Sequence, residues 1–261
     1  MAVTPNRRDV LQWAVVTPFV AAGSGVADAA RAPVLERLIQ EARPLPSVAA
    51  RIDLISGKLL GIRYRSNTLI GSPKLPEQFV IRDDAFDCVT YCEAVLAAAI
   101  SRDFAEFETN LRRIRYNDGV VRYDMRNHYF ADWCKRNIDN GICKPVAIEP
   151  AVKFDKVLKW HGEFGDHKVS ISAIEKSTMF AQQKRLSVGD VIGFVSHREG
   201  LDYFHTGFIA FSKSGDLTLR SAALSQGRVL DWKMADFIAT NPVRYVTLLR
   251  PAENASTADR R

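Results

Sequence analysis

The sequence FDCVTYCEAVLAAAI, residues 86–100, places an aspartate and a cysteine at the head of a largely apolar run. The run has the length and composition of a buried helix that begins at Cys88. Asp87 is suited to be its N-cap, because its carboxylate can accept hydrogen bonds from the unpaired N–H groups of the first turn. This end of the helix dipole also favours a thiolate over a thiol. Cys88 is therefore a candidate nucleophile; the alternative is a cysteine that simply packs in the core.

Two apolar runs rich in β-forming residues follow in the second half of the chain, at residues 186–195 and 203–211. His205 lies near the start of the second run. Gly215-Asp216 predicts a hairpin between this strand and residues 217–223. An imidazole at the start of a strand can face a cysteine at the tip of a helix, which is the pairing of base and nucleophile that cysteine-dependent acyl transfer requires.

On these residues the sequence resembles the NlpC/P60 superfamily of papain-like cell-wall amidohydrolases. In that superfamily an Asp-Cys helix start, a Gly-Asp strand and a His-x-Gly strand follow one another, as do Asp87-Cys88, Gly189-Asp190 and His205-Thr206-Gly207 here. More closely, the chain resembles the branch once called domain of unknown function 1460. The matching stretches, spread over residues 50–250, are Tyr64 with TLIG at 68–71, FDCVTYCE at 86–93, IRYNDG at 114–119, RNHYF at 126–130 with Asp132-Trp133, and the segment 189–207.

The resemblance implies a fold and a reaction. The fold is papain-like α+β, with N-terminal helices, the nucleophile helix among them, packed on an antiparallel sheet. The reaction is hydrolysis of the amide between N-acetylmuramic acid and L-alanine in peptidoglycan fragments, with Cys88 as nucleophile and His205 as base and then acid. The residues themselves support cysteine-dependent amide cleavage only. A stem-peptide endopeptidase and a non-catalytic wall-binding module of the same fold therefore stay as alternatives.

One departure from the family concerns the third catalytic residue. The family strand after the catalytic histidine reads Arg-His-Ala-Ser, and its histidine orients the first one; here the run is Arg220-Ser221-Ala222-Ala223. Ser221 is the candidate for this role, since a hydroxyl can hydrogen-bond an imidazole, although more weakly than a carboxylate would. The alternatives are an ordinary strand serine, with His205 oriented by another group, or weakened catalysis.

Four further residues are candidates for substrate binding: Tyr64, Arg126, Asn127 and His128. The Tyr64 phenol could donate a hydrogen bond near the oxyanion, and the alternative is a half-buried core tyrosine. Arg126 could bind a substrate carboxylate bidentately, or it could instead hold its own loop. With Asn127 and His128 it forms a dense polar cluster between aromatic residues.

Hydrophobic periodicity predicts where the elements lie. We expect helices over residues 34–42, 47–60, 88–101 and 104–114, a short helix that ends at Asn140-Gly141, and strands from residue 168 onward, interrupted at 234–239 and closed by 243–249. Helices first and strands afterwards predict a single α+β domain, which we place at residues 30–252. A polar tail follows at 253–261.

The first 29 residues have the three parts of an export signal in order. Arg7 and Arg8 are followed by a moderately apolar stretch at 11–22 and by Ala27-Asp28-Ala29, an Ala-x-Ala cleavage site. The paired arginines predict a twin-arginine signal, and the apolar stretch is too short to span a membrane. We therefore expect a periplasmic protein without a membrane span after signal removal; the alternative is a disordered cytosolic arm.

The composition of the chain limits which partners and cofactors we expect. The net charge is +6 over 261 residues, and no basic run is interleaved with aromatic residues as in a nucleic-acid groove, so peptidoglycan or a muropeptide is the expected partner. The histidines and cysteines lack zinc-site spacing, so we expect no metal and no cofactor. If Cys88 stays a thiol, at most one disulfide can form among Cys92, Cys134 and Cys143, and Cys134–Cys143 is the favoured pair.

Overall fold

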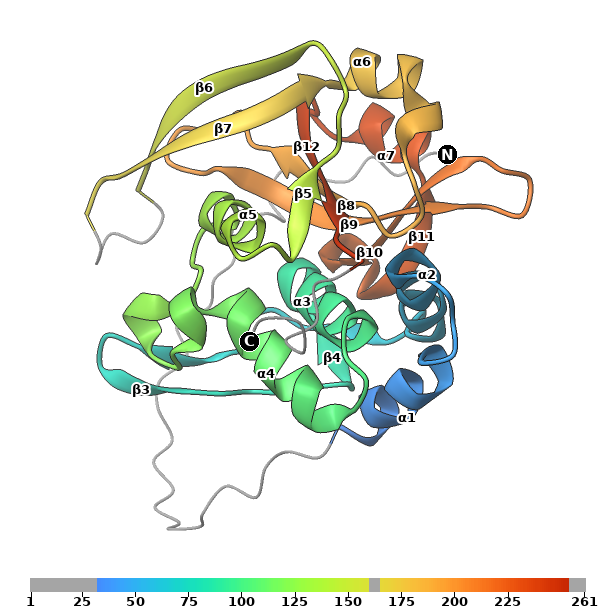
Figure 1. Cartoon of the computed structure of the whole chain (residues 1–261). Helices are drawn as coiled ribbons and strands as arrows, with labels where there is room; N and C mark the ends of the chain where they lie inside the picture. The colour runs from blue at the N-terminus through green and yellow to red at the C-terminus, as the bar shows by residue number, and fades with distance from the viewer. Residues whose placement is uncertain (1–31, 160–164, 254–261) are drawn as a thin grey trace, which may run out of the picture.

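The computed structural model describes residues 32–159 and 165–253 (Figure 1). Helices fill most of the first half of the chain and strands most of the second half, as the periodicity predicts. The predicted export signal at 1–29 lies outside the described residues, and so does the predicted tail apart from Glu253. Within the described residues, no helix is long and apolar enough to cross a membrane.

The helices, apart from α6, begin and end close to the predicted boundaries. They are α1 (Pro33–Ala42), α2 (Val48–Lys58), α3 (Cys88–Ala99), α4 (Phe104–Arg115), α5 (Phe130–Asp139), α6 (Lys176–Ala181) and α7 (Met234–Thr240). Ser47, Asp87 and Asp103 cap α2, α3 and α4, each accepting a hydrogen bond from the N–H three residues further on. Gly141 has a φ of 67° just beyond α5, which agrees with the predicted helix stop.

The main sheet has the strand order β4-β1-β11-β10-β9-β8-β12-β7-β6, with β5 paired to β12. Neighbouring strands are antiparallel except β1 and β4. The strands are β1 (Arg63–Tyr64), β4 (Ala85–Phe86), β5 (Cys143–Pro145), β6 (Ala151–Leu158), β7 (His167–Glu175), β8 (Val191–Val195), β9 (Tyr203–Phe211), β10 (Leu217–Ala223), β11 (Arg228–Lys233) and β12 (Tyr245–Pro251); β2 (Ile70–Ser72) and β3 (Leu75–Gln78) form a separate hairpin. The predicted hairpin at Gly215-Asp216 joins β9 and β10 and is confirmed.

Helix α3 packs on one face of β9 and β10, and α7 packs on the other. The rings of Tyr91 in α3 and Phe208 in β9 meet edge to face, with centroids 5.9 Å apart. On the opposite face, the centroids of Phe194 in β8 and Phe237 in α7 lie 4.7 Å apart. The predicted α+β class, with the Cys88 helix packed on a largely antiparallel sheet, is confirmed by this arrangement.

Periodicity does not predict β5, β6 or α6. Strand β6 alternates exposed and half-buried residues and fully buries only Leu158, and Lys156 interrupts the face that carries Val152, Phe154 and Leu158, so its pattern is weaker than that of a core strand. It is held as a strand by pairing with β7 along its whole length, and the two extend together as a long hairpin (Figure 1). A strand whose main contact is its partner strand leaves a weak signal in its own sequence.

The favoured disulfide is absent from the structure, in which all four cysteines are free thiols. Cys134 in α5 and Cys143 in β5 are both buried in the apolar core, and burial raises the pKa of each thiol. Both therefore pack as small apolar side chains. Counting cysteines in the sequence could name a favoured pair but could not show whether the pair is joined.

Candidate active site

Cys88 is the first residue of α3, and the residue before it fixes its position. Asp87 Oδ1 accepts a hydrogen bond from the Thr90 N–H at 2.8 Å, and Thr90 Oγ1 accepts one from the Asp87 N–H at 3.0 Å, which makes a capping box. Thr68 Oγ1 donates to Asp87 Oδ2 at 3.3 Å. The predicted N-cap is confirmed, and it holds the Cys88 thiol at the helix N-terminus.

The surroundings of the Cys88 thiol disfavour its ionised form. Burial raises the pKa of Cys88 to about 12, and the Asp87 carboxylate acts in the same direction. The backbone N–H groups of Thr206, Cys88 and Val89 lower this pKa, but by less. The expectation that the helix N-terminus makes Cys88 ionise easily is therefore wrong, because burial and a neighbouring negative charge outweigh the helix N–H groups.

His205 precedes Thr206 in β9, and successive side chains of a strand point to opposite faces. Thr206 Oγ1 lies 3.9 Å from Cys92 Sγ on the α3 side, whereas the His205 ring packs on the α7 side, so the structure does not bring the His205 ring to Cys88 as the sequence predicts. His205 Nε2 lies 2.9 Å from Ser221 Oγ on the neighbouring strand β10. The centroid of its ring is 5.3 Å from that of Phe237. Burial lowers the pKa of His205 to about 4, so the imidazole is neutral near pH 7.

The approach of Ser221 to His205 depends on a glycine between the two strands. Ser221 is fully buried. A Cβ on Gly207 would come within 2.8 Å of the Ser221 Cβ and within 2.7 Å of the Arg220 carbonyl oxygen, closer than real Cβ contacts allow. The glycine of the His-x-Gly pattern thus leaves the space in which Ser221 lies beside the histidine.

The Gly189-Asp190 pair supports the fold rather than the site. Gly189 has a φ of 83°, a conformation that suits glycine, and a Cβ there would lie 3.2 Å from the Ile52 side chain. Asp190 is buried, and its carboxylate accepts hydrogen bonds from Arg250 at 2.7 and 2.8 Å. The pair therefore fixes the turn into β8 and ties it to β12.

Cys88 opens onto a cavity of about 300 Å³ that also receives all four predicted substrate-binding residues. Its lining comprises Tyr64, Ser66, Asn67, Thr68 and Leu69 from the segment after β1, Asp87, Cys88, Val89, Thr90 and Glu93 from the start of α3, and Arg126, Asn127, His128, Phe130 and Trp133 around the start of α5. His205 and Ser221 are not in this lining. A larger cavity of about 660 Å³, between α5 and β7, contains none of the predicted site residues.

Tyr64 and Arg126 both line the Cys88 cavity. Burial, followed by the nearby Cys88 and Asp87, raises the pKa of Tyr64, so its phenol stays protonated and can donate a hydrogen bond. Arg126 Nη1 donates to both carboxylate oxygens of Glu77 in β3, at 3.0 and 3.1 Å. Arg126 therefore holds its own segment against β3 and lines the cavity at the same time.

Asn127 and His128 are also tied to the protein. Asn127 Nδ2 donates to the Ile114 carbonyl at 3.0 Å, and its backbone N–H donates to the Arg115 carbonyl at 2.9 Å. His128 Nε2 lies 2.6 Å from the Tyr123 carbonyl oxygen. These bonds fix the segment between α4 and α5 as a wall of the cavity.

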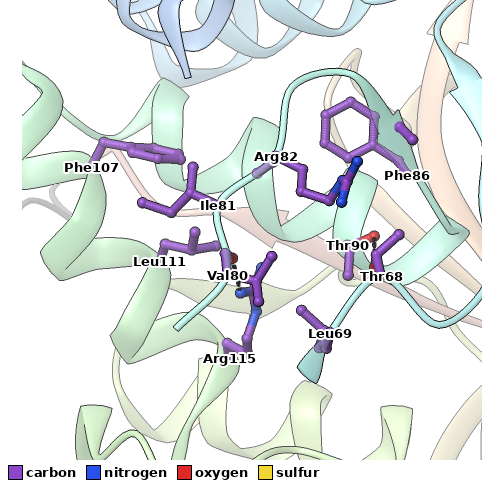
Figure 2. A pocket seen from close by; sticks show the side chains of 12 residues that line it. Thr68, Leu69, Val80, Ile81, Arg82, Phe86, Thr90, Phe107, Leu111 and Arg115 are labelled. Atoms are coloured by element: carbon purple, nitrogen blue, oxygen red, sulfur yellow. Dashed lines mark hydrogen bonds between the residues drawn. The ribbon is translucent and has the colours of Figure 1, made fainter. Parts of the chain in front are cut away.

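Sequence analysis does not predict the buried ion pair between Arg115 and Glu93 that lies below this cavity wall. Arg115 Nε donates to Glu93 Oε2 at 2.7 Å, and the Arg115 and Glu93 side chains are 4% and 3% exposed. Figure 2 shows Arg115 reaching the Val80 carbonyl, with a hydrogen-bond distance of 2.7 Å, beside a small cavity behind α3. A glutamate inside an otherwise apolar helix is the signal in the sequence that could have pointed to such a partner.

Across the described ranges 32–159 and 165–253, no three His, Cys, Asp or Glu side chains are grouped as a metal site. The structure therefore brings together a thiol at a helix start and a polar cavity in front of it, while the imidazole of His205 lies on the other face of the adjoining strand. A thiol at a helix start that opens onto a polar cavity is one of the features of a cysteine-dependent hydrolase.

Residues 54–246 match the model of the AmiA-like family, described as N-acetylmuramoyl-L-alanine amidase-like, and the chain belongs to this family. Its members are amidase-like peptidoglycan hydrolases. No curated protein sequence matches the chain.

Solved structures share the fold. A protein from Legionella pneumophila described by the family model DUF1460 superposes with a TM-score of 0.71 at 21% identity, over 84% of this chain and 95% of that chain. An N-acetylmuramoyl-L-alanine amidase from Bacteroides uniformis superposes with a TM-score of 0.67 at 21% identity, over 83% of this chain and 98% of the amidase chain. At this level of identity the likeness concerns the fold alone.

Proposed function

We propose that this chain is an N-acetylmuramoyl-L-alanine amidase of the papain-like NlpC/P60 type, with Cys88 as nucleophile and His205 as general base. The observation that carries the proposal is the position of Cys88. It starts α3, opens onto a polar cavity, and lies within reach of the N–H of the residue that follows His205. The family to which the chain belongs supports the choice of reaction.

The proposed mechanism begins from a neutral thiol and a neutral imidazole, and it needs the His205 ring, which packs on Phe237 in this structure, to reach the Cys88 side of β9. His205 takes the thiol proton as the sulfur attacks the carbonyl carbon of the amide, and the carbonyl oxygen becomes an oxyanion. The Cys88 N–H and the Tyr64 hydroxyl are the proposed donors to this oxyanion. The imidazolium then returns its proton to the leaving L-alanine nitrogen as the C–N bond breaks, and water hydrolyses the resulting thioester with His205 again as base.

The wall formed by Arg126, Asn127 and His128 is the proposed binding surface for the stem peptide. Muropeptides carry several amides and free carboxylates. Since Glu77 already holds one nitrogen of Arg126, the guanidinium presents its other donors in a fixed orientation. Such a wall would bind the substrate by directed hydrogen bonds more than by net charge.

Product analysis of a defined muropeptide tests the proposed reaction. We expect mass spectrometry to find free N-acetylmuramic acid or its glycan together with an intact stem peptide. Shortened stem peptides would indicate an endopeptidase instead. Retention of the muropeptide without any product would indicate a wall-binding module.

Replacing Ser221 with alanine should lower the rate of hydrolysis by about one to two orders of magnitude, because the imidazole loses the hydroxyl that holds Nε2. Ser221→Thr keeps the hydroxyl and should retain more activity. Rates measured against pH give a second readout: the wild-type acid limb should lie near pH 4, where His205 becomes protonated and can no longer act as base. Equal rates and pH profiles for wild type and Ser221→Ala would leave Ser221 as an ordinary strand residue.

We further propose that the protein acts outside the cytoplasm, on the strength of the twin-arginine pattern at Arg7 and Arg8. Residues 1–32 fused to a folded reporter should export it, and replacing both arginines with lysine should block export. Fractionation of cells that express the two fusions measures this. A reporter that stays in the cytosol with the native sequence would overturn the assignment.

A further inference from the structure

Strand β7 pairs with β6 along one edge, while its other edge is partly open. On that second edge, β7 pairs with β12 at Ile174 and Glu175, near its end. Towards its beginning the two strands separate, and a cavity of about 660 Å³ lies between β7, α5 and the segment that follows β5. Figure 1 shows β6 and β7 leaving the rest of the sheet together. The first part of β7 therefore runs along this cavity as an edge strand.

The backbone of β7 offers hydrogen-bonding groups to the cavity at every second residue. The Ser172 carbonyl accepts a hydrogen bond from Thr247 Oγ1 of β12 at 2.8 Å. The N–H of Lys176, just beyond β7, also donates to the segment that leads into β12, at 3.0 Å. Since the backbone groups of alternate residues in an antiparallel strand face the same edge, those of Lys168 and Ser170 face this edge too. Neither residue has a β12 residue opposite it in the described register, so both present their N–H and C=O groups to the cavity.

The side chains of β7 give the cavity two different faces, because successive residues of a strand alternate. Ile171 and Ala173 belong to the apolar core that α5 also contributes to. Lys168 and Ser170, on the other face, are exposed. A strand added at this edge therefore needs apolar side chains towards α5 and polar side chains on the opposite face.

Two lysines give the polar face a positive charge. Lys153 of β6 lies opposite Ser172, and Lys168 lies on the same face of β7. Both line the cavity, and neither has an ion-pair partner among the residues that the structure describes. Asp155, between them on this face of β6, is not part of the lining. Carboxylates on the polar face of an occupant would complement the two ammonium groups.

The other charged side chains of the lining are already engaged. Lys135 Nζ lies 2.5 Å from Asp139 Oδ2, and Asp132 Oδ2 lies 2.9 Å from His167 Nε2. The Glu149 carboxylate accepts the backbone N–H two residues further on, at 2.8 Å. The charge available to an occupant is therefore that of the two cavity lysines.

We propose that this cavity binds an extended peptide in which acidic and apolar residues alternate, as an added strand on the open edge of β7. Hydrogen bonds to the backbone of Lys168 and Ser170 hold the peptide, and its alternate side chains contact α5 on one face and the two lysines on the other. About five residues fill the edge, because residues 168–172 span about 14 Å at about 3.4 Å per residue. The chain's own residues 254–261 do not match this pattern, since they include one aspartate and two arginines.

Isothermal titration calorimetry of the full chain with the acetylated, amidated peptide Glu-Val-Glu-Val-Glu tests the proposal. We expect it to bind at least about tenfold more tightly than Lys-Val-Lys-Val-Lys, which reverses the charge, or Glu-Glu-Val-Val-Glu, which loses the alternation. Replacing Lys153 and Lys168 together with glutamine should weaken binding about fivefold at low salt, as expected for two exposed charges.

Ser170→Pro tests the backbone contact separately. Proline removes the N–H that faces the cavity, and it removes no hydrogen bond to β6, because the Ser170 backbone faces the other edge. This variant should bind Glu-Val-Glu-Val-Glu at least about tenfold more weakly. Ser170→Ala keeps the N–H and is the matched control, which should bind as the wild type does. Circular dichroism verifies that each variant is folded.

Equal affinities for the three peptides, absence of binding by Glu-Val-Glu-Val-Glu, or unchanged binding by Ser170→Pro would each overturn the proposal. A wild-type dimer in sedimentation analysis that is lost in Ser170→Pro, without peptide binding, would assign the edge to a second copy of the chain instead. None of these readouts needs hydrolysis, so the result is independent of the proposed function.

Discussion

Replacing Cys88 with serine, or His205 with alanine, should reduce amide hydrolysis by at least about a thousandfold. Serine occupies the same place at the start of α3 but is a much poorer nucleophile. Alanine at position 205 removes the proposed base. Because the pKa of Cys88 is raised to about 12, few thiolates are present near pH 7 without that base. The double variant should therefore lose little more activity than either single variant.

Two other variants serve as matched controls for this result. His197 is an exposed histidine and Cys143 a buried cysteine outside the Cys88 cavity, so His197→Ala and Cys143→Ala should retain hydrolysis. Initial rates on a defined muropeptide measure all four variants, and circular dichroism verifies their folding. Near wild-type turnover by Cys88→Ser or His205→Ala would remove the cysteine mechanism.

The sequence locates the Cys88 site because the signals there are local. A cap followed by an apolar run specifies α3, and Gly215-Asp216 specifies the β9–β10 hairpin, since both depend on neighbours along the chain. The ionisation of Cys88 depends on what covers it after folding. The covering residues, such as Tyr64 and Thr206, come from distant segments, so the helix N-terminus alone gives the wrong direction for the pKa.

The contacts of the cavity wall also come from distant segments, so the sequence does not predict them. The RNHYF segment at 126–130 reveals polar residues near one another, but not their partners. Arg126 pairs with Glu77, which lies on a short hairpin far away in the sequence. Binding substrate and holding the loop, which the sequence leaves as alternatives for Arg126, are compatible in the structure, because the residue both lines the cavity and bonds to β3.

Replacing Arg115 with methionine should lower the free energy of unfolding by about 3–5 kcal/mol, because it leaves the Glu93 carboxylate buried without its partner. Burial raises the pKa of Glu93 and the Arg115 charge lowers it, so the loss of Arg115 removes the group that makes the ionised form tolerable. Urea unfolding followed by circular dichroism measures the difference. The exposed pair Arg122–Asp124, with side chains 62% and 53% exposed, is the matched control, and Arg122→Met should leave the free energy of unfolding close to that of the wild type.

The double variant Glu93→Met with Arg115→Met should recover most of the lost stability, since two apolar side chains leave no buried charge unpaired. A loss below about 1 kcal/mol in Arg115→Met would show that water or another group can reach Glu93. The rate of hydrolysis by the double variant then shows whether the ion pair is needed for activity as well as for stability. Arg115 also holds the Val80 carbonyl (Figure 2), and Glu93 lines the Cys88 cavity. If stability returns while activity does not, the ion pair is needed to shape the cavity wall, beyond its part in holding α3 and α4 together.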